Sequence, residues 1–229
     1  MNILALDTSM GACSAAVLRA DGAALGLFAR QEAMARGHAE ALMPMVAGVM
    51  DEAHLAFPDL DLIAATVGPG SFTGVRITIA AARGLALATG AKLYGTDSLT
   101  VMAKSALATC ALGPFAVAVD ARRGMLYLGL YDDAGRRLEG PLLIAPEEAL
   151  ALLPGSVLLA VGSGAVLLAE AGAEARRPLE ARLPELQPSA AALAAIALEA
   201  RETVPVLCPL YLRPPDARPQ AQMVATRRQ

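Results

Sequence analysis

Short apolar runs separated by turn residues fill the first part of the chain. Residues 2–6 form one run, which ends at Asp7, and residues 12–19 and 24–30 form two more around Asp21-Gly22. Short apolar segments bounded by polar residues and glycine are typical of strands, and Asp-Gly between two of them favours a hairpin. The pattern predicts a three-stranded antiparallel meander whose first strand ends at a carboxylate.

Helical periodicity replaces this pattern from residue 37 to residue 55. Leu42, Val46, Val49 and Ala53 recur on one face, as expected for a helix that covers a sheet. A second apolar stripe lies beside the first and consists of Ala39, Met43, Ala47, Met50 and His54. Such a wide apolar sector indicates either additional core or an interface with a partner.

The next segment places a glycine-rich loop between a strand and a helix. Residues 62–67 form an apolar run, the loop spans residues 68–74, and residues 75–89 are apolar on nearly every side except at Arg76 and Arg83. A helix of this kind is buried on more than one side. We expect a further strand at 92–96 and a helix from Asp97 or Ser98 to about residue 109.

The second half repeats this order. The predicted strands are 115–119, 125–131, 137–144 and 157–161; the predicted helices begin at Pro146, at 163–164 and at Ser189. Residues 174–188, rich in Arg, Glu and Pro, indicate an irregular crossing. Each half opens with a strand that ends in Asp, which predicts a duplicated α/β fold with two lobes, 1–110 and 111–229.

Composition narrows the class of protein. The 229 residues are 55% hydrophobic and 3% aromatic and carry a net charge of -3, which argues against a general nucleic-acid binder. Three scattered cysteines fit a reducing cytosol. Residues 149–169 are uncharged, but Pro154-Gly155 and residues 162–164 interrupt them, so we expect no membrane span and a soluble cytoplasmic protein.

The strand-end carboxylates Asp7 and Asp120 are the first candidates for chemistry. Facing each other across a cleft, they would suit magnesium and phosphate; the alternative is that each caps a turn. The glycine loop suits either an anion or the close approach of another backbone, and Ser71 or Thr73 can cap the following helix. It lacks the Gly-Lys-Ser/Thr of a P-loop, and both interpretations remain open.

Two further groups have a functional and a structural interpretation. His38 is followed four residues later by Leu42, so the His-x-x-x-His pair of a metal site is missing and no metal site is expected. Arg122 and Arg123 suit contact with phosphate or an RNA backbone, or form a solvated turn.

Four motifs taken together resemble the TsaB (YeaZ) family of accessory subunits in bacterial tRNA threonylcarbamoyladenosine synthesis. They are Asp7-Thr8-Ser9, Gly-Pro-Gly-Ser-Phe-Thr-Gly-Val-Arg-Ile at 68–77, Asp-Ala-Arg-Arg-Gly at 120–124 and Pro-Leu-Tyr-Leu-Arg at 209–213. They occur in the family's order over almost the whole chain. One departure is Thr78, where the family usually has glycine, and it bears on local packing.

The resemblance implies two ribonuclease H-like lobes of the actin-like/Hsp70-like ATPase superfamily. It also implies a non-catalytic subunit that binds a TsaD-like transferase through the first two helices, joined by a TsaE-like ATPase, and that acts on tRNA through the complex at the adenosine beside the anticodon. A homodimer is expected when the partner is absent. The expected interface residues are Met43, Ala47, Met50, Val75, Ile79 and Ala82.

The same resemblance makes the inter-lobe cleft a vestigial nucleotide site. Its residues would be Asp7, Thr8, Ser9, Gly68, Gly70, Ser71, Thr73, Gly74 and Asp120. No cofactor is required, and weak binding of ATP or ADP with magnesium at the complex stays open. Two alternatives remain: an ATPase or kinase-like enzyme that uses Asp7 and Asp120, and a module that binds tRNA directly, with Arg122 and Arg123 as RNA contacts.

Overall fold

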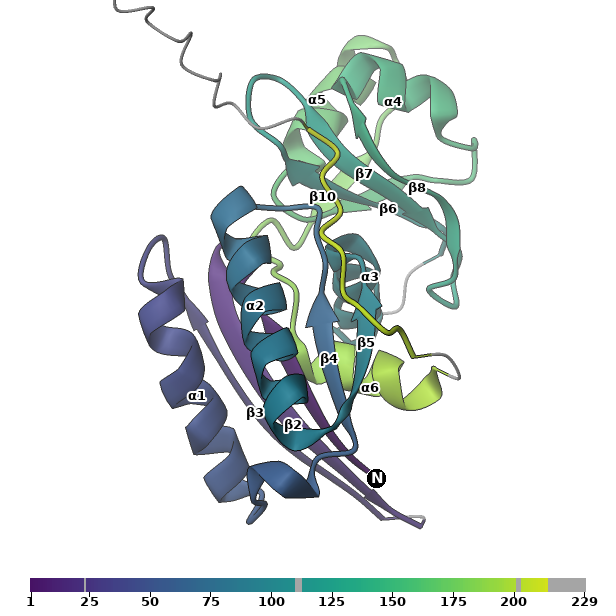
Figure 1. The fold of residues 1–229 in the computed structure, drawn as a ribbon. Helices are drawn as coiled ribbons and strands as arrows, with labels where there is room; N and C mark the ends of the chain where they lie inside the picture. The colour runs from purple at the N-terminus through teal and green to yellow at the C-terminus, as the bar shows by residue number, and fades with distance from the viewer. Residues whose placement is uncertain (23, 110–112, 201–202, 214–229) are drawn as a thin grey trace, which may run out of the picture.

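The computed structural model describes residues 1–22, 24–109, 113–200 and 203–213. Two five-stranded mixed sheets form two lobes, one above the other in Figure 1. The predicted two-lobed α/β fold is confirmed.

The first sheet has the order β3-β2-β1-β4-β5. Its strands are β1 (Asn2–Asp7), β2 (Ala12–Asp21), β3 (Ala24–Ala33), β4 (Leu62–Thr66) and β5 (Lys92–Thr96). The predicted meander is confirmed, because β1 pairs antiparallel with β2 and β2 with β3. β4 pairs parallel with β1 and with β5, so the ends of β1 and β4 meet at the same edge of the sheet.

Helices α1 (His38–Glu52) and α2 (Phe72–Thr89) lie side by side on one face of this sheet (Figure 1). Leu42, Val46 and Val49 of α1 join the apolar cluster beneath the two helices, as their periodicity predicts. The short helix η1 (Phe57–Asp59) leads from α1 into β4. Gly90 ends α2 in the left-handed region, with φ of 76°, which glycine adopts without steric cost.

The second sheet repeats the topology of the first, in the order β10-β9-β6-β7-β8. Its strands are β6 (Phe115–Asp120), β7 (Leu126–Tyr131), β8 (Arg137–Ile144), β9 (Leu159–Val161) and β10 (Glu180–Arg182). Helices α4 (Pro146–Leu152) and α5 (Ala165–Glu174) pack on one face of it. β10 was not predicted: it lies inside the segment 174–188, which the sequence indicated as irregular.

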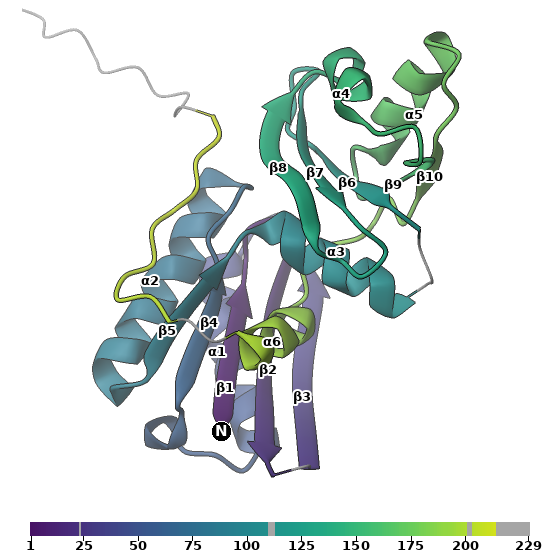
Figure 2. The same cartoon turned by 90° about the vertical axis from the view of Figure 1, so that its right-hand side faces the viewer.

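The last helix of each half packs against the other half. α3 (Ser98–Thr109) lies between the sheets and places Leu99 and Met102 in the cluster of β6 and β7. α6 (Ala190–Glu199) covers the opposite face of the first sheet, where Leu193 packs among residues of β1, β2 and β4 (Figure 2). The prediction that residues 111–229 form the second lobe is therefore wrong for α6. The alanine-rich face of this helix is buried against the first sheet.

Residues 203–213, called here the C-terminal strap, also run along the first lobe (Figure 1). Val204 forms an antiparallel bridge with Leu93 of β5, and the Leu210 amide donates to the Val67 carbonyl at 2.7 Å. Arg83 of α2 donates from Nη2 to the Leu207 carbonyl at 2.6 Å. The strap thus closes the β5 edge of the first sheet and reaches the junction of the lobes.

In the part of the chain that the structure describes, no helix combines the length and the apolar character needed to cross a bilayer. The uncharged segment 149–169 is divided among α4, β9 and α5.

Candidate functional site

The glycine loop at 68–74 is seated directly on the end of β1. A Cβ atom on Gly70 would lie 2.2 Å from the Ser9 carbonyl oxygen, and one on Gly74 would lie 2.0 Å from that of Thr8. The Ser71 amide donates to the Ser9 carbonyl at 2.7 Å. The glycines of the loop therefore permit close contact with the backbone at the end of β1. Of the two interpretations of the loop, this contact favours close backbone packing over anion binding.

The start of α2 is capped by one of the two predicted hydroxyls. Ser71 Oγ accepts a hydrogen bond from the Gly74 amide at 3.3 Å, whereas Thr73 is exposed in the first turn. The loop amides of Ser71 and Gly74 thus already donate within the protein. A phosphate at this place would have to displace those bonds.

Thr78 holds the end of β1. Its Oγ1 accepts from the Thr8 amide at 2.8 Å and lies 2.8 Å from Thr8 Oγ1. Thr8 Oγ1 donates in turn to the Gly74 carbonyl at 2.8 Å. Since Thr8 and Thr78 are both fully buried, these bonds satisfy polar groups that water cannot reach.

Asp7 is completely buried at this edge of the sheet. Its Oδ1 accepts from Ser9 Oγ at 2.6 Å, from the Ser9 amide at 3.2 Å and from Thr66 Oγ1. Among the described residues, Oδ2 has no hydrogen-bond partner. Burial raises the pKa of Asp7 to about 6, with the bonds from Ser9 and Thr66 acting in the opposite direction.

Asp120 caps the turn between β6 and β7. Its Oδ1 accepts from the Arg122 amide at 2.7 Å, and its Oδ2 lies 3.3 Å from Arg122 Nη1. Arg122 and Arg123 are exposed and adopt left-handed backbone angles, with φ of 65° and 57°. The polar contacts of Asp7 and Asp120 thus involve different residues, and the turn-capping interpretation of Asp120 describes what is observed.

No group of three or more His, Cys, Asp or Glu residues suited to a metal ion occurs in the described ranges of the chain. His38 lies at the start of α1, where its Nε2 is 3.1 Å from the Met10 carbonyl oxygen.

The surface of α1 and α2 differs from the expected interface. Met50, Val75, Ile79 and Ala82 are buried in the core beneath the two helices. The prediction that these four are presented to a partner is wrong, because α1 and α2 turn these faces toward the sheet and toward each other. A charge at Met50 or Ile79 would disrupt the core instead of testing an interface.

Met43 and Ala47 are exposed, as an interface requires. The exposed small and apolar residues of the two helices, called here the outer helix face, are Ala39, Met43, Ala47, Ala80, Gly84, Leu87 and Ala88. Leu87 is 89% exposed, the largest value among the large hydrophobic side chains of the described residues.

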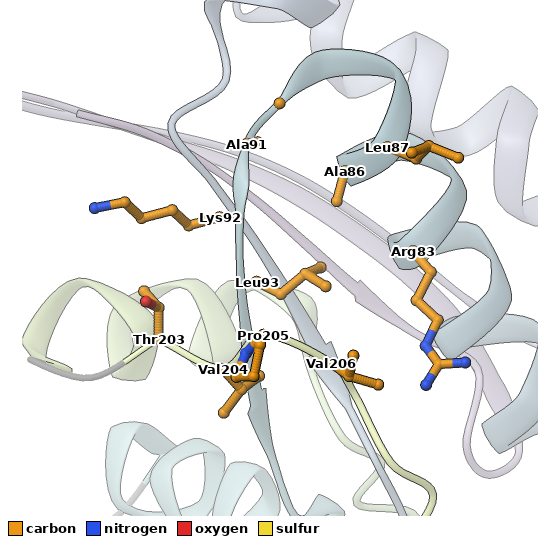
Figure 3. Close-up of a pocket in the computed structure, with 11 residues that line it drawn as sticks. Arg83, Ala86, Leu87, Ala91, Lys92, Leu93, Thr203, Val204, Pro205 and Val206 are labelled. Carbon is orange, nitrogen blue, oxygen red and sulfur yellow. The ribbon is translucent and has the colours of Figure 1, made fainter.

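A pocket of about 840 Å³ lies at the end of α2, between this helix, β5 and the C-terminal strap. Figure 3 shows Leu87 and Arg83 on the helix side and Val204, Pro205 and Val206 on the strap side. The sequence does not indicate this pocket, because nothing in the local pattern shows that residues 203–206 return to β5.

Asp97 is a polar link between the lobes that the sequence indicated only as a helix cap. It accepts from the Thr100 amide at 2.9 Å, which is the predicted capping bond, and from Arg137 Nη1 of β8 at 2.6 Å. The buried Tyr131 hydroxyl lies 3.2 Å from Thr100 Oγ1, and burial raises the pKa of Tyr131. This network fixes α3 to the second sheet.

Two lobes of repeated topology, with a buried carboxylate at the end of a strand, define a ribonuclease H-like, ATPase-type fold. The glycine loop of this fold packs directly against the backbone of Thr8 and Ser9.

A family model described as TsaD, tRNA N6-adenosine threonylcarbamoyltransferase, matches residues 31–183. Haemophilus influenzae TsaB is 30% identical over 176 residues, which cover 72% of each chain. Escherichia coli TsaB is 37% identical over 131 residues, covering 57% of this chain and 55% of that protein.

Further relatives match over nearly the whole chain. An uncharacterized protein of Mycobacterium tuberculosis is 37% identical over 222 residues, with 96% of this chain and 95% of that protein covered. The solved structure of YeaZ from Pseudomonas aeruginosa has 31% identity and a TM-score of 0.78, covering 92% of this chain and 100% of that chain. The chain belongs to the TsaB (YeaZ) family.

Proposed function

We propose that the protein is a non-catalytic partner subunit in tRNA threonylcarbamoyladenosine biosynthesis. Relatives that carry the TsaB name are described as proteins of this pathway. In the proposal the chain binds a TsaD-like transferase, which modifies the adenosine beside the anticodon. A TsaE-like ATPase and tRNA would join through that complex.

The outer helix face is the observation that carries the proposal. Small residues such as Ala47, Ala80 and Gly84 permit the close approach of other helices, and Leu87 provides an exposed apolar anchor. The exposed charged side chains of the two helices are Glu40, Asp51 and Glu52 on α1 and Arg76 and Arg83 on α2, and Arg83 is bonded to the strap. Contiguous apolar surface of this kind marks an interface with another protein.

The burial and contacts of Asp7, the glycine loop and Asp120 favour a subunit that has no catalytic activity of its own. Asp7 is fully buried, the glycine loop packs on Thr8 and Ser9, and Asp120 caps its own turn. The enzyme alternative rests on the unpartnered Oδ2 of Asp7 and is less favoured. Weak nucleotide binding at the complex stays a prediction.

Co-purification with a TsaD homologue tests the proposal. The Leu87→Glu and Ala47→Glu variants should lose at least about 90% of the captured partner, because each places a charge within the proposed apolar contact. Leu138→Glu is the matched control: Leu138 is 55% exposed on β8, away from α1 and α2, and this variant should capture the partner normally. Retention by both helix variants would refute the interface.

An assay of modified tRNA, with each component omitted in turn, tests the division of labour. Product should require both proteins, and Asp7→Asn should leave the rate of the assembled complex within about twofold of the unaltered rate.

Calorimetry with magnesium and ATP on the isolated chain addresses the enzyme alternative: tight binding that is lost in Asp7→Asn would favour it. Sedimentation of the isolated chain should show a homodimer that Leu87→Glu dissociates.

A further inference from the structure

An exposed aromatic and guanidinium cluster lies at the start of α2. The rings of Phe72 and Tyr211 have centroids 4.8 Å apart, and each residue is more than one third exposed. The Arg76 guanidinium lies 3.7 Å from the centre of the Phe72 ring, and its Nε donates to the Tyr211 hydroxyl at 2.9 Å. The strap thus brings Tyr211 to residues that precede it by more than a hundred positions.

Arg213, two residues along the strap, joins this cluster to the turn after β6. Its Nη1 donates to the Ala121 carbonyl at 2.8 Å and its Nη2 to the Arg122 carbonyl at 3.3 Å. Two residues of extended chain span roughly 7 Å, so the aromatic pair and the arginine-bearing turn are neighbours. We call Phe72, Arg76, Arg122, Arg123, Tyr211 and Arg213 the junction patch.

The junction patch concentrates positive charge on a protein whose net charge is -3. Within the described ranges of the chain, Arg76 contacts an aromatic ring and a hydroxyl, and Arg213 contacts two carbonyl groups, so these contacts orient the guanidinium groups without neutralising them. Arg122 pairs with Asp120 at 3.3 Å, yet its side chain is 84% exposed. The positive charge is local, which agrees with the absence of a general basic footprint.

We propose that the junction patch binds a single-stranded segment of RNA. Exposed aromatic rings beside guanidinium groups are the combination that such segments require, since unpaired bases stack on the rings and phosphates pair with the arginines. Arginine suits phosphate because its planar fork donates two parallel hydrogen bonds. The inference rests on the proposed function in one respect: the RNA would be the anticodon loop of the tRNA that the complex modifies.

Fluorescence anisotropy with a labelled anticodon stem-loop RNA tests the proposal, on the full chain alone and on its complex with a TsaD homologue. Arg122→Glu should weaken binding about tenfold and reduce the slope of log affinity against log salt by about 1 to 2, because a phosphate contact is lost. Tyr211→Ala should weaken binding about tenfold with an unchanged salt slope, since it removes stacking surface. Thermal unfolding confirms that each variant is folded.

Arg136→Glu is the matched control. Arg136 is 82% exposed, pairs with Asp132 at 2.9 Å, and lies in the turn at the other end of β7. This variant should bind RNA as the unaltered chain does. Equal losses in Arg136→Glu and Arg122→Glu would overturn the proposal, as would unchanged binding in Arg122→Glu.

Two further outcomes separate this inference from others. Full displacement of the RNA by free ATP at equal concentration would assign the patch to a mononucleotide and overturn the RNA proposal. Absence of any effect of Arg122→Glu in both the chain and the complex would overturn it while leaving co-purification, and thus the proposed function, intact. Loss of co-purification in Leu87→Glu together with normal RNA binding would support both proposals independently.

Discussion

Thr8 and Thr78 are separated by 70 positions in the sequence, and their hydroxyl oxygens lie 2.8 Å apart in the core. Because Thr8 Oγ1 donates to the Gly74 carbonyl, the proton in the hydroxyl pair comes from Thr78, whose oxygen also accepts from the Thr8 amide. One side chain of α2 therefore bonds to both the amide and the hydroxyl of Thr8. Thr78 therefore has a specific structural role in holding the end of β1.

Thr78→Val should destabilise the fold by about 1–3 kcal/mol, because it leaves the buried Thr8 amide without an acceptor while preserving volume. Chemical denaturation measures the change. Thr78→Ser keeps the hydroxyl and should cost less. A loss in Thr78→Ser as large as that in Thr78→Val would contradict the assignment of the loss to the hydrogen bonds.

Gly74→Ala should destabilise the protein by at least roughly 3 kcal/mol, the upper part of the range for single substitutions. The added Cβ would meet the Thr8 carbonyl oxygen at 2.0 Å, and backbone cannot move away cheaply. Gly84→Ala is the matched control on the same helix, since nothing lies within 4 Å of its Cβ position. It should stabilise the helix by about 0.5–1 kcal/mol. Thermal or urea unfolding would contradict this if the two variants behaved alike.

Asp7 should make the protein less stable as pH rises from about 4 to about 6. Folding raises the pKa from 3.8 to about 6, so in this window the folded state binds more protons than the unfolded state. The resulting penalty is absent below pH 4 and complete above pH 6, where it amounts to roughly 3 kcal/mol.

Urea unfolding at several pH values measures this penalty. Asp7→Asn should remove this part of the pH dependence, so the difference between variant and unaltered protein should change across the window. A constant difference from pH 4 to pH 7 would contradict the raised pKa.

Arg83→Met should loosen the C-terminal strap. It removes the donor that holds the Leu207 carbonyl at 2.6 Å, and a hydrogen bond from a charged group contributes about 1.5–3 kcal/mol. Hydrogen exchange at the Val204 and Leu210 amides should become about tenfold faster or more. Arg19→Met, which removes a similar bond to the Ala53 carbonyl, should leave strap exchange unchanged. Faster exchange at the strap in both variants would point to general destabilisation.

Most of the secondary structure could be predicted because the local signals agree with one another. The Asp-Gly turn, the apolar runs of the first strands and the glycine at the end of α2 each indicate the observed element. β10 gave no such signal: its three residues, Glu180–Arg182, are polar or small, and it exists because its backbone pairs with β9. Strand pairing of that kind depends on tertiary position rather than on side-chain pattern.

The candidate site was predicted less well than the fold. Periodicity identified the apolar stripes of α1 and α2 but could not show which stripe meets the neighbouring helix, so Met50 and Ile79 were assigned to the surface. Asp7 was found from its place at a strand end. Its burial and the closure of the glycine loop depend on contacts from Thr66 and Thr78, and the junction patch depends on the return of Tyr211 across α2.

Helices α3 and α6 each pack against the other half of the chain, and this has a consequence for how the two halves of the gene can be separated. The first half, made alone, would expose the sheet face that α6 covers, including Ile3, Leu18 and Leu62. The second half would lose Leu99 and Met102 from beneath β6 and β7. Each half is therefore an incomplete folding unit, and neither is expected to persist in solution as a monomer. The two halves with repeated topology therefore depend on each other, and deletion of either is expected to leave the other unable to stay folded in solution.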